Sequence, residues 1–301
     1  MFKNRWIDHQ KAKRNLIKQI NKSGRSIDRK YSPFELLNED YIDFRGLEFD
    51  NIKIKKIKFE KADLSYSGFT SAWIEDCIFK DVIFESTDFT DMSDHGNQFI
   101  NCIFLKCKFN YAALGYNGTR FTNCTFNNSN FTKAIFIRGE FTKCEFRHCK
   151  LKGIDFDVSS FEDCNFIGEL NDVWFRGNYA LASDAKHFGL AKKNKMENVS
   201  FKDATLTYVM YTNNCDLSTI RIPNTGNYQL FDNWKSRLEK TIYEINTWSP
   251  EEKKEAESFM KYYLIHAITQ DWYLINVENL QEELGIEITE KIIISLKKDN
   301  R

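Results

Sequence analysis

The stretch Phe121–Phe146 reads FTNCTFNNSNFTKAIFIRGEFTKCEF, with phenylalanine at every fifth position. An α-helix places apolar residues three and four positions apart, and a half-buried strand alternates with a period of two. A period of five fits neither pattern, so each unit must turn a corner before it presents the next ring. The chain therefore has to be interpreted as a repeat architecture before single elements are assigned.

The same spacing continues far beyond this stretch. Most of the 26 phenylalanines of the chain occupy the central position of a five-residue unit, which we call the centre. The centres run from Phe44 to Leu114 and from Phe121 to Phe166, and a third tract begins at Phe201. The core predicted for the second tract contains Phe121, Phe126, Phe131, Phe136, Phe141 and Phe146.

The residue two places before each centre, which we call the slot, is small in most units. All 8 cysteines occupy slots, and the predicted core includes Cys124, Cys144, Cys149 and Cys164. Metal ligands usually come in closely spaced pairs, whereas these cysteines follow the repeat. We therefore expect buried, reduced thiols that fill the core, and neither a metal site nor a cofactor.

Units such as ADLSY (Ala62–Tyr66), TDFTD (Thr87–Asp91) and SNFTK (Ser129–Lys133) resemble those of the pentapeptide repeat family. The resemblance covers roughly residues 44–222. It implies a mainly β fold, a right-handed quadrilateral β-helix with four units per coil, whose centres and slots face inward. With strands about 4.8 Å apart, some seven coils would form a rod roughly 35 Å long.

We expect three parts in the chain. They are a basic, partly helical N-terminal cap at 1–42, the β-helix at 43–222 with an excursion at about 167–199, and a helical C-terminal domain at 223–301. The excursion has helical, basic character, with Lys186, Lys192, Lys193 and Lys195. Two interpretations of it stay open, contact with a partner and packing on a face of the rod.

Two further positions break the pattern. Asp94 stands where a centre should be apolar, and we expect a bulged corner that lets it point outward; the alternative is a carboxylate–imidazole site with His95. Between Leu114 and Phe121, the segment GYNG (Gly115–Gly118) predicts an inserted loop with Tyr116 at its tip.

The two ends of the chain predict covers for the open strand edges of a β-helix. Residues 2–20 form an amphipathic basic pattern with Phe2, Lys3 and Trp6, which predicts a helix that caps the rod. Such a helix can also bind an anionic membrane or nucleic acid.

The C-terminal part loses the five-residue period. The sequence SPEE (Ser249–Glu252) predicts a capping box, followed by a helix near Pro250–Ile275. Residues 286–297 fit a helix or a strand. The helix carries more aromatic residues than one buried face needs, which predicts a homodimer through the C-terminal helices. The expected contacts are Phe259, Tyr263, Leu264 and Trp272; the alternative is a capped monomer in which 228–247 and 286–297 cover the second face.

The sequence contains none of the common catalytic motifs, so we expect a non-enzymatic scaffold for protein–protein contact, with an unidentified protein partner. The resemblance offers a rival, because some members of the family mimic duplex DNA and bind type II topoisomerases such as gyrase. A third hypothesis is a membrane-surface adaptor. Basic and acidic residues balance at 43 each, which disfavours nucleic acid as a partner. Without a signal peptide or an apolar span, we expect a cytoplasmic protein with little affinity for membranes.

Overall fold

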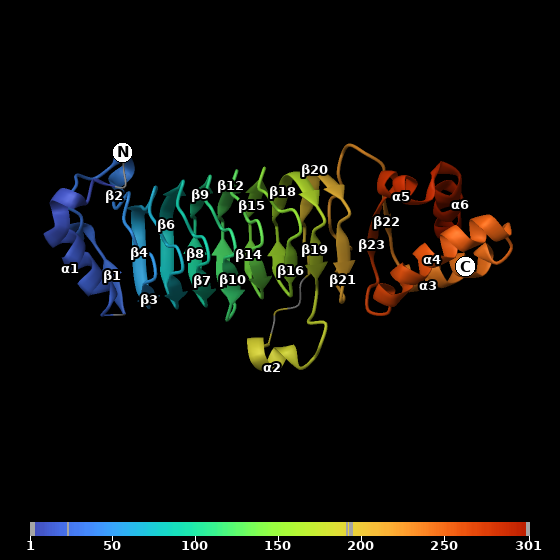
Figure 1. Cartoon of the computed structure of the whole chain (residues 1–301), viewed down its shortest axis with the longest axis horizontal. Helices are drawn as coiled ribbons and strands as arrows, with labels where there is room; N and C mark the ends of the chain where they lie inside the picture. Colours follow the sequence, from blue (N-terminus) through green and yellow to red (C-terminus); the bar gives the residue numbers. More distant parts are fainter. Residues whose placement is uncertain (1–3, 23, 191, 193–194, 299–301) are drawn as a thin grey trace.

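Parallel coils stacked along one axis make up the middle of the chain, and helices stand at both ends (Figure 1). The structure is a computed structural model and describes residues 4–22, 24–190, 192 and 195–298. The rod is a parallel β-helix of about 7 turns. The fold class expected from the repeat is therefore confirmed.

Each coil has four sides. Phe121 lies opposite Phe141 and Phe126 opposite Phe146, so the same position returns after 20 residues. We number the sides by their columns of centres. Side 1 carries Phe59, Phe79, Phe99, Phe121, Phe141 and Phe161; side 2 carries Phe84, Phe104, Phe126, Phe146 and Phe166; side 3 carries Phe69, Phe89, Phe109 and Phe131; side 4 carries Ile54, Ile74, Asp94, Leu114, Phe136, Phe156 and Phe175.

Sides 1 and 2 belong to a 13-stranded sheet and side 4 to an 8-stranded sheet, whereas side 3 is joined by single bridges. The larger sheet contains β1 (Arg25–Ile27), β2 (Ile42–Asp43), β4 (Ile57–Asp63), β6 (Ile78–Glu85), β8 (Gln98–Ile100), β9 (Ile103–Leu105), β11 (Arg120–Thr122), β12 (Thr125–Asn127), β14 (Glu140–Thr142), β15 (Glu145–Arg147), β17 (Ser160–Glu162), β18 (Asn165–Asn171) and β20 (Ser200–Thr207). Side 4 contains β3 (Lys53–Lys55), β5 (Trp73–Glu75), β7 (Ser93–His95), β10 (Ala113–Tyr116), β13 (Ile135–Ile137), β16 (Asp155–Asp157), β19 (Trp174–Arg176) and β21 (Met210–Thr212).

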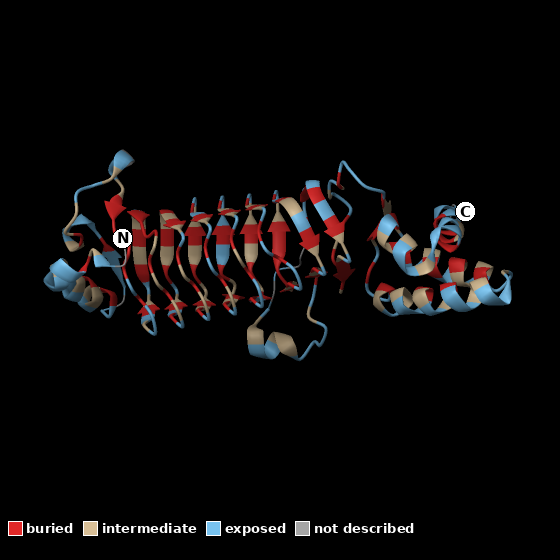
Figure 2. Ribbon diagram, turned by 45° about the horizontal axis from the view of Figure 1, so that its top comes forward, coloured by how far each residue is buried: buried red, intermediate tan, exposed pale blue. Residues whose placement is uncertain are grey.

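The interior of the rod is a set of aromatic ladders. The rings of Phe121 and Phe141 are nearly parallel, with their centroids 4.8 Å apart, and the rings of Phe126 and Phe146 are arranged in the same way. Figure 2 shows buried residues in coil after coil along the rod, alternating with partly buried and exposed ones. Because each buried phenylalanine contributes about 1.5–3 kcal/mol, these ladders are the main source of stability in the rod.

Nearly every corner is turned by one residue in the left-handed conformation, two places after the centre. Examples are Asn123, Asn128 and Lys143, with φ of 53°, 52° and 55°. Asparagine tolerates this region better than lysine, which accepts a cost of about 1–2 kcal/mol there. The left-handed conformation therefore explains why many units carry Asn or Asp two places after the centre.

The N-terminal cap begins with the 3-10 helix η2 (Ile7–His9) and α1 (Gln10–Ile20), followed by the 3-10 helices η3 (Arg29–Tyr31) and η4 (Asn38–Asp40). The regular α-helix is thus shorter than the predicted 2–20, and the predicted Phe2 and Lys3 lie outside the described residues. Trp6, Leu16 and Ile20 are buried, while β1 pairs with β4 along the first open edge.

The excursion is shorter than predicted. β18 and β19 continue the coils within 167–199, since β18 pairs with β20 and β19 with β21. The chain leaves the coil after β19 and rejoins it near the buried Met196. Between these points stands the short helix α2 (Asp184–Phe188), which projects beside the rod (Figure 1); Lys193 lies outside the described residues.

The C-terminal domain contains α3 (Trp234–Ile245), α4 (Pro250–Ala267), α5 (Val277–Leu284) and α6 (Ile286–Lys297), with β22 (Tyr228–Phe231) paired to β23 (Tyr273–Asn276). The capping box at Ser249 and Glu252 is present as predicted. The helix predicted for Pro250–Ile275 is wrong at its end, because Tyr273–Asn276 pairs with β22 instead. Residues 286–297 form a helix, which settles the ambiguity of that short apolar run.

Candidate interaction surfaces

The slot cysteines lie inside the rod and make hydrogen bonds there. Cys124, Cys144, Cys149 and Cys164 are buried. The thiol of Cys144 donates to the carbonyl of Phe121 in the preceding coil, at 3.3 Å, and accepts from the backbone N–H of Cys124. Burial raises the pKa of the Cys149 thiol to about 12 and that of Cys77 to about 11. These thiols are therefore poor nucleophiles at neutral pH.

Asp94 points inward, contrary to the predicted outward corner. Its side chain is buried, accepts a hydrogen bond from Asn97 and accepts another from the backbone N–H of Gly115 at 2.9 Å. Gly115 belongs to the inserted loop, where the register between β7 and β10 shifts. The carboxylate therefore satisfies a backbone donor that the insertion removes from the regular ladder. Burial raises the pKa of Asp94 to about 6, although the hydrogen bonds from Asn97 and Gly115 act to lower it.

His95 faces outward, so it forms no carboxylate–imidazole site with Asp94. Its ring stacks on Trp73 at 3.8 Å and lies 5.5 Å from the ring of Tyr116. The hydroxyl of Ser93 is 2.7 Å from its Nε2 atom. Because the imidazole is enclosed between two rings on a strand surface, we interpret it as a packing residue rather than a general base.

The excursion packs against side 4 through two contacts. Phe188 of α2 meets Tyr116 with ring centroids 5.8 Å apart, and the Arg138 guanidinium donates to the Phe188 carbonyl. Tyr116 is therefore half-buried and does not stand free at the tip of its loop. Beneath the excursion, burial and the neighbouring Asp155 raise the pKa of Asp157 to about 6. Leu181 and Leu190 remain exposed on this element.

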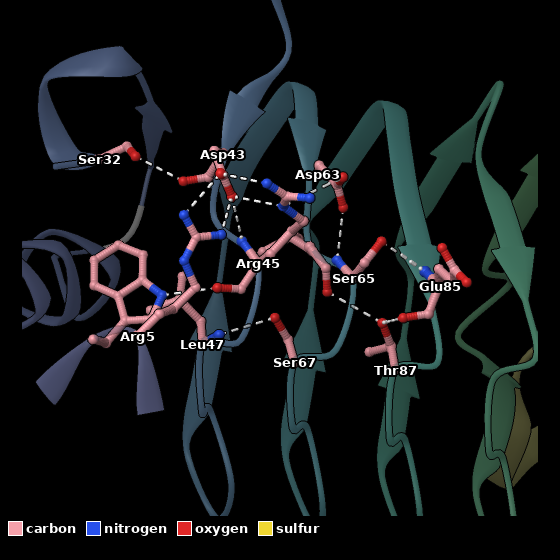
Figure 3. Close-up of polar contacts among 12 residues, drawn as sticks. Arg5, Ser32, Asp43, Arg45, Leu47, Asp63, Ser65, Ser67, Glu85 and Thr87 are labelled. Carbon is pink, nitrogen blue, oxygen red and sulfur yellow. Dashed lines mark hydrogen bonds and ion pairs between the residues drawn. The ribbon is translucent and has the colours of Figure 1, made fainter. Parts of the chain in front are cut away.

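The first coil is closed by a buried ion network (Figure 3). Asp43 accepts two hydrogen bonds from Arg5, at 2.8 and 2.9 Å, and two from the guanidinium of Arg45, at 3.1 and 2.9 Å. Burial alone raises the pKa of Asp43, but the hydrogen bonds from Arg45 and Arg5 hold it below its ordinary value. Nearby, Ser65, directly after the centre Leu64, and Ser67, in the slot of Phe69, accept hydrogen bonds from backbone N–H groups of adjacent coils.

The last coil is closed by side chains of the C-terminal domain. Gln270 accepts from the N–H of Cys215 at 3.0 Å and donates to the carbonyl of the same residue. The hydroxyl of Tyr228 accepts from the N–H of Leu206 at 2.9 Å, and Asn276 donates to the Leu206 carbonyl at 2.7 Å. These contacts satisfy an open strand edge without adding a strand.

The four residues predicted as dimer contacts are turned toward their own domain. Phe259, Tyr263, Leu264 and Trp272 are each half-buried against the core. Tyr263 lies 5.3 Å from Tyr273 and 4.5 Å from Phe259, measured between ring centroids. Other apolar side chains stay exposed, namely Tyr262 and Ile265 of α4 and Ile268 directly after it, which are 47%, 68% and 68% exposed.

A groove lies between the last coils and helices α4 and α5. It encloses about 440 Å³ and is lined by the rings of Trp174, Tyr208, Phe259, Tyr262 and Tyr263, together with Asp172 and Glu283. Surface charge elsewhere on the rod is mixed, because acidic side chains pair with basic ones of the next coil. Examples are Glu60 with Lys80 at 2.8 Å and Asp88 with Lys108 at 3.5 Å.

The described residues contain no group of three or more histidine, cysteine or acidic side chains arranged to hold a metal ion. Nor does any described helix combine the length and the apolar character that a bilayer span requires.

Comparison with protein families identifies the repeat. Residues 117–153 match pentapeptide repeats in 8 copies. They lie within the rod, whose coils before and after keep the same register of centre upon centre. The chain is a pentapeptide repeat protein. The matching family model describes a repeat and not a catalytic domain.

Two solved structures are similar to part of this pentapeptide repeat protein. Trypsin-treated QnrB1, a plasmid-mediated fluoroquinolone resistance protein, is 18% identical, with 64% of this chain and 88% of that chain covered and a TM-score of 0.39. HetL, a pentapeptide repeat protein involved in heterocyst differentiation regulation from the cyanobacterium Nostoc sp., is 10% identical, with 61% and 90% covered and a TM-score of 0.28. A search of curated proteins gave no match.

Sequence reasoning missed the aromatic groove of this pentapeptide repeat protein. Its walls come from corner and strand positions of two successive coils, among them Asp172, Trp174 and Tyr208, and from the C-terminal domain much later in the sequence. Surface aromatics at repeat positions that normally carry polar residues were a usable signal, since Trp174 and Tyr208 both depart from the pattern.

Proposed function

We propose that this pentapeptide repeat protein is a non-enzymatic scaffold for protein–protein contact that pairs with a second copy through the outer face of α4. The supporting observation is the exposure of Ile265 near the end of α4 and of Ile268 directly after it, with Tyr262 one turn earlier. Contiguous apolar surface of this kind is uncommon on monomers and marks contact sites. A two-fold contact there would be self-complementary.

Two rival functions receive less support. A mimic of duplex DNA needs a continuous acidic stripe, yet one column of the described rod carries both signs: the bridged side 3 column runs from Glu48 and Asp88 to Lys108 and Lys150. A membrane-surface adaptor needs an exposed apolar face on the basic helix, whereas Leu16 and Ile20 of α1 are buried against the first coil.

Light scattering on the full chain tests the pairing. We expect a dimer at micromolar concentration and a monomer for the double variant Ile265→Glu/Ile268→Glu, because two charges cannot be buried in an apolar contact. The matched control is Ile103→Glu, which changes a 44% exposed isoleucine on the rod. A monomeric wild-type protein, or a double variant that stays dimeric, would overturn the pairing through α4.

A further inference from the structure

The groove between the last coils and the C-terminal helices has a distinctive chemical lining. Its walls are aromatic, and its only charged lining residues are the carboxylates of Asp172 and Glu283. No lysine or arginine is among the described residues that line it. At about 440 Å³ it falls within the range of sites that hold one small ligand or one long side chain.

The two carboxylates of the groove differ from those acidic groups of the rod that pair with a basic side chain. Neither Asp172 nor Glu283 forms an ion pair with any described residue, in contrast to Asp155, whose carboxylate is 2.7 Å from Arg176. Glu283 stands in the last turn of α5, where the helix dipole already adds negative potential. Burial, followed by the charge of Glu282, raises the pKa of Glu283. A cation in the groove would offset the negative potential of the helix end and stabilise the charged form of Glu283.

The rings are placed to receive such a cation. Tyr262 lies 5.7 Å from Tyr263, and Phe259 is 4.5 Å from Tyr263, so three rings of α4 form one wall. Trp174 of β19 also lines the groove, and the guanidinium of Arg176 lies 4.7 Å from its ring. Aromatic faces attract cations through the ring quadrupole, and guanidinium stacks on them best because it is planar and weakly hydrated.

We propose that this groove binds an arginine side chain of a basic protein segment. The guanidinium stacks between the α4 rings and Trp174 while Asp172 and Glu283 accept its N–H groups. The groove contains neither Ile265 nor Ile268 of the proposed pairing face, although Tyr262 belongs to both surfaces. The proposal rests on the proposed scaffold function only in taking a protein as the source of the arginine.

Calorimetric titration of the full chain tests the proposal. The probe is the capped peptide acetyl-Gly-Arg-Gly-Arg-Gly-amide, and its control is the same peptide with citrulline, which keeps the shape and removes the charge. We expect binding of the arginine peptide and about tenfold weaker binding for Glu283→Gln, which corresponds to about 1.4 kcal/mol. Tyr262→Ala should weaken it similarly, and Glu287→Gln, an exposed acid outside the groove, should leave it unchanged.

Each outcome decides a specific point. Equal binding of the citrulline peptide, or equal weakening by Glu283→Gln and Glu287→Gln, would overturn a specific guanidinium site. Absence of binding would overturn it as well, provided that thermal unfolding shows the wild-type chain folded. Tighter binding of tetramethylammonium than of the peptide would overturn the choice of arginine. Peptide binding that persists in Ile265→Glu/Ile268→Glu would support the groove even if the pairing through α4 fails.

Discussion

At the scale of single residues, the slot is where the rod admits polar atoms into its core. Ser129 in its slot donates to the Phe104 carbonyl at 3.1 Å and accepts from the Cys107 N–H at 3.2 Å. Cys107, one coil earlier, donates likewise to the carbonyl of Phe84. Small side chains with a donor and an acceptor thus bridge neighbouring coils at corners, where the backbone alone leaves groups unpaired. This hydrogen bonding explains why the slots carry Cys, Ser and Thr better than the small size of these side chains does.

The cysteines should be protected from reagents in the folded protein. All 8 are buried, and burial raises the pKa values of several of their thiols. We expect negligible labelling by a thiol reagent under native conditions and full labelling in denaturant. Rapid native labelling of most of them would contradict the inward placement.

Asp94 should make stability depend on pH. Its pKa in the folded protein, about 6, lies above its ordinary value, so the folded state holds the proton more tightly. Stability from this group is therefore greatest at low pH and is lost as pH rises from about 4 through 6. Urea unfolding between pH 4 and 7 should show a smaller fall with rising pH in Asp94→Asn than in the wild type. Parallel curves would contradict the assignment, since Asp157 contributes equally to both proteins.

At the scale of elements, the corner conformation predicts a stabilising substitution. Lys143 is exposed and has a φ of 55°. Lys143→Asn should raise the free energy of unfolding by about 0.5–1 kcal/mol, because asparagine adopts the left-handed conformation at a lower energetic cost than lysine. The control Lys150→Asn changes an exposed lysine that is not left-handed. Chemical denaturation measures both, and equal effects would argue against backbone strain as the cause.

The contact between the last coil and the C-terminal domain depends on the hydrogen bonds of Gln270 with the backbone of Cys215. Gln270→Ala leaves the N–H and carbonyl of Cys215 buried without their partner, which should cost about 1–3 kcal/mol. Thr269→Ala, at an exposed neighbouring position, is the matched control. Hydrogen exchange should show faster exchange at Cys215 in the first variant alone. Unchanged exchange there would mean that other contacts hold the domain in place.

At the scale of the whole molecule, the repeat predicted the rod and its inward columns, because one five-residue pattern determines both. Individual departures from the repeat were harder to predict from the sequence. Asp94 and the inserted loop were treated separately, although the structure joins the carboxylate to the Gly115 N–H one coil later. The end of α4 and the groove were missed for the same reason. Both depend on contacts between residues far apart in sequence, and periodicity contains no information about such contacts.

The stacking of identical coils also has a mechanical consequence. Each coil touches only its neighbours, as the pairing of Phe121 with Phe99 on one side and Phe141 on the other illustrates. Under tension between the two termini, coils should detach one at a time from an end. Twenty residues released per coil lengthen the chain by about 65–70 Å. Force–extension curves should therefore show repeated steps of one size, with a longer step where the coil containing α2 opens.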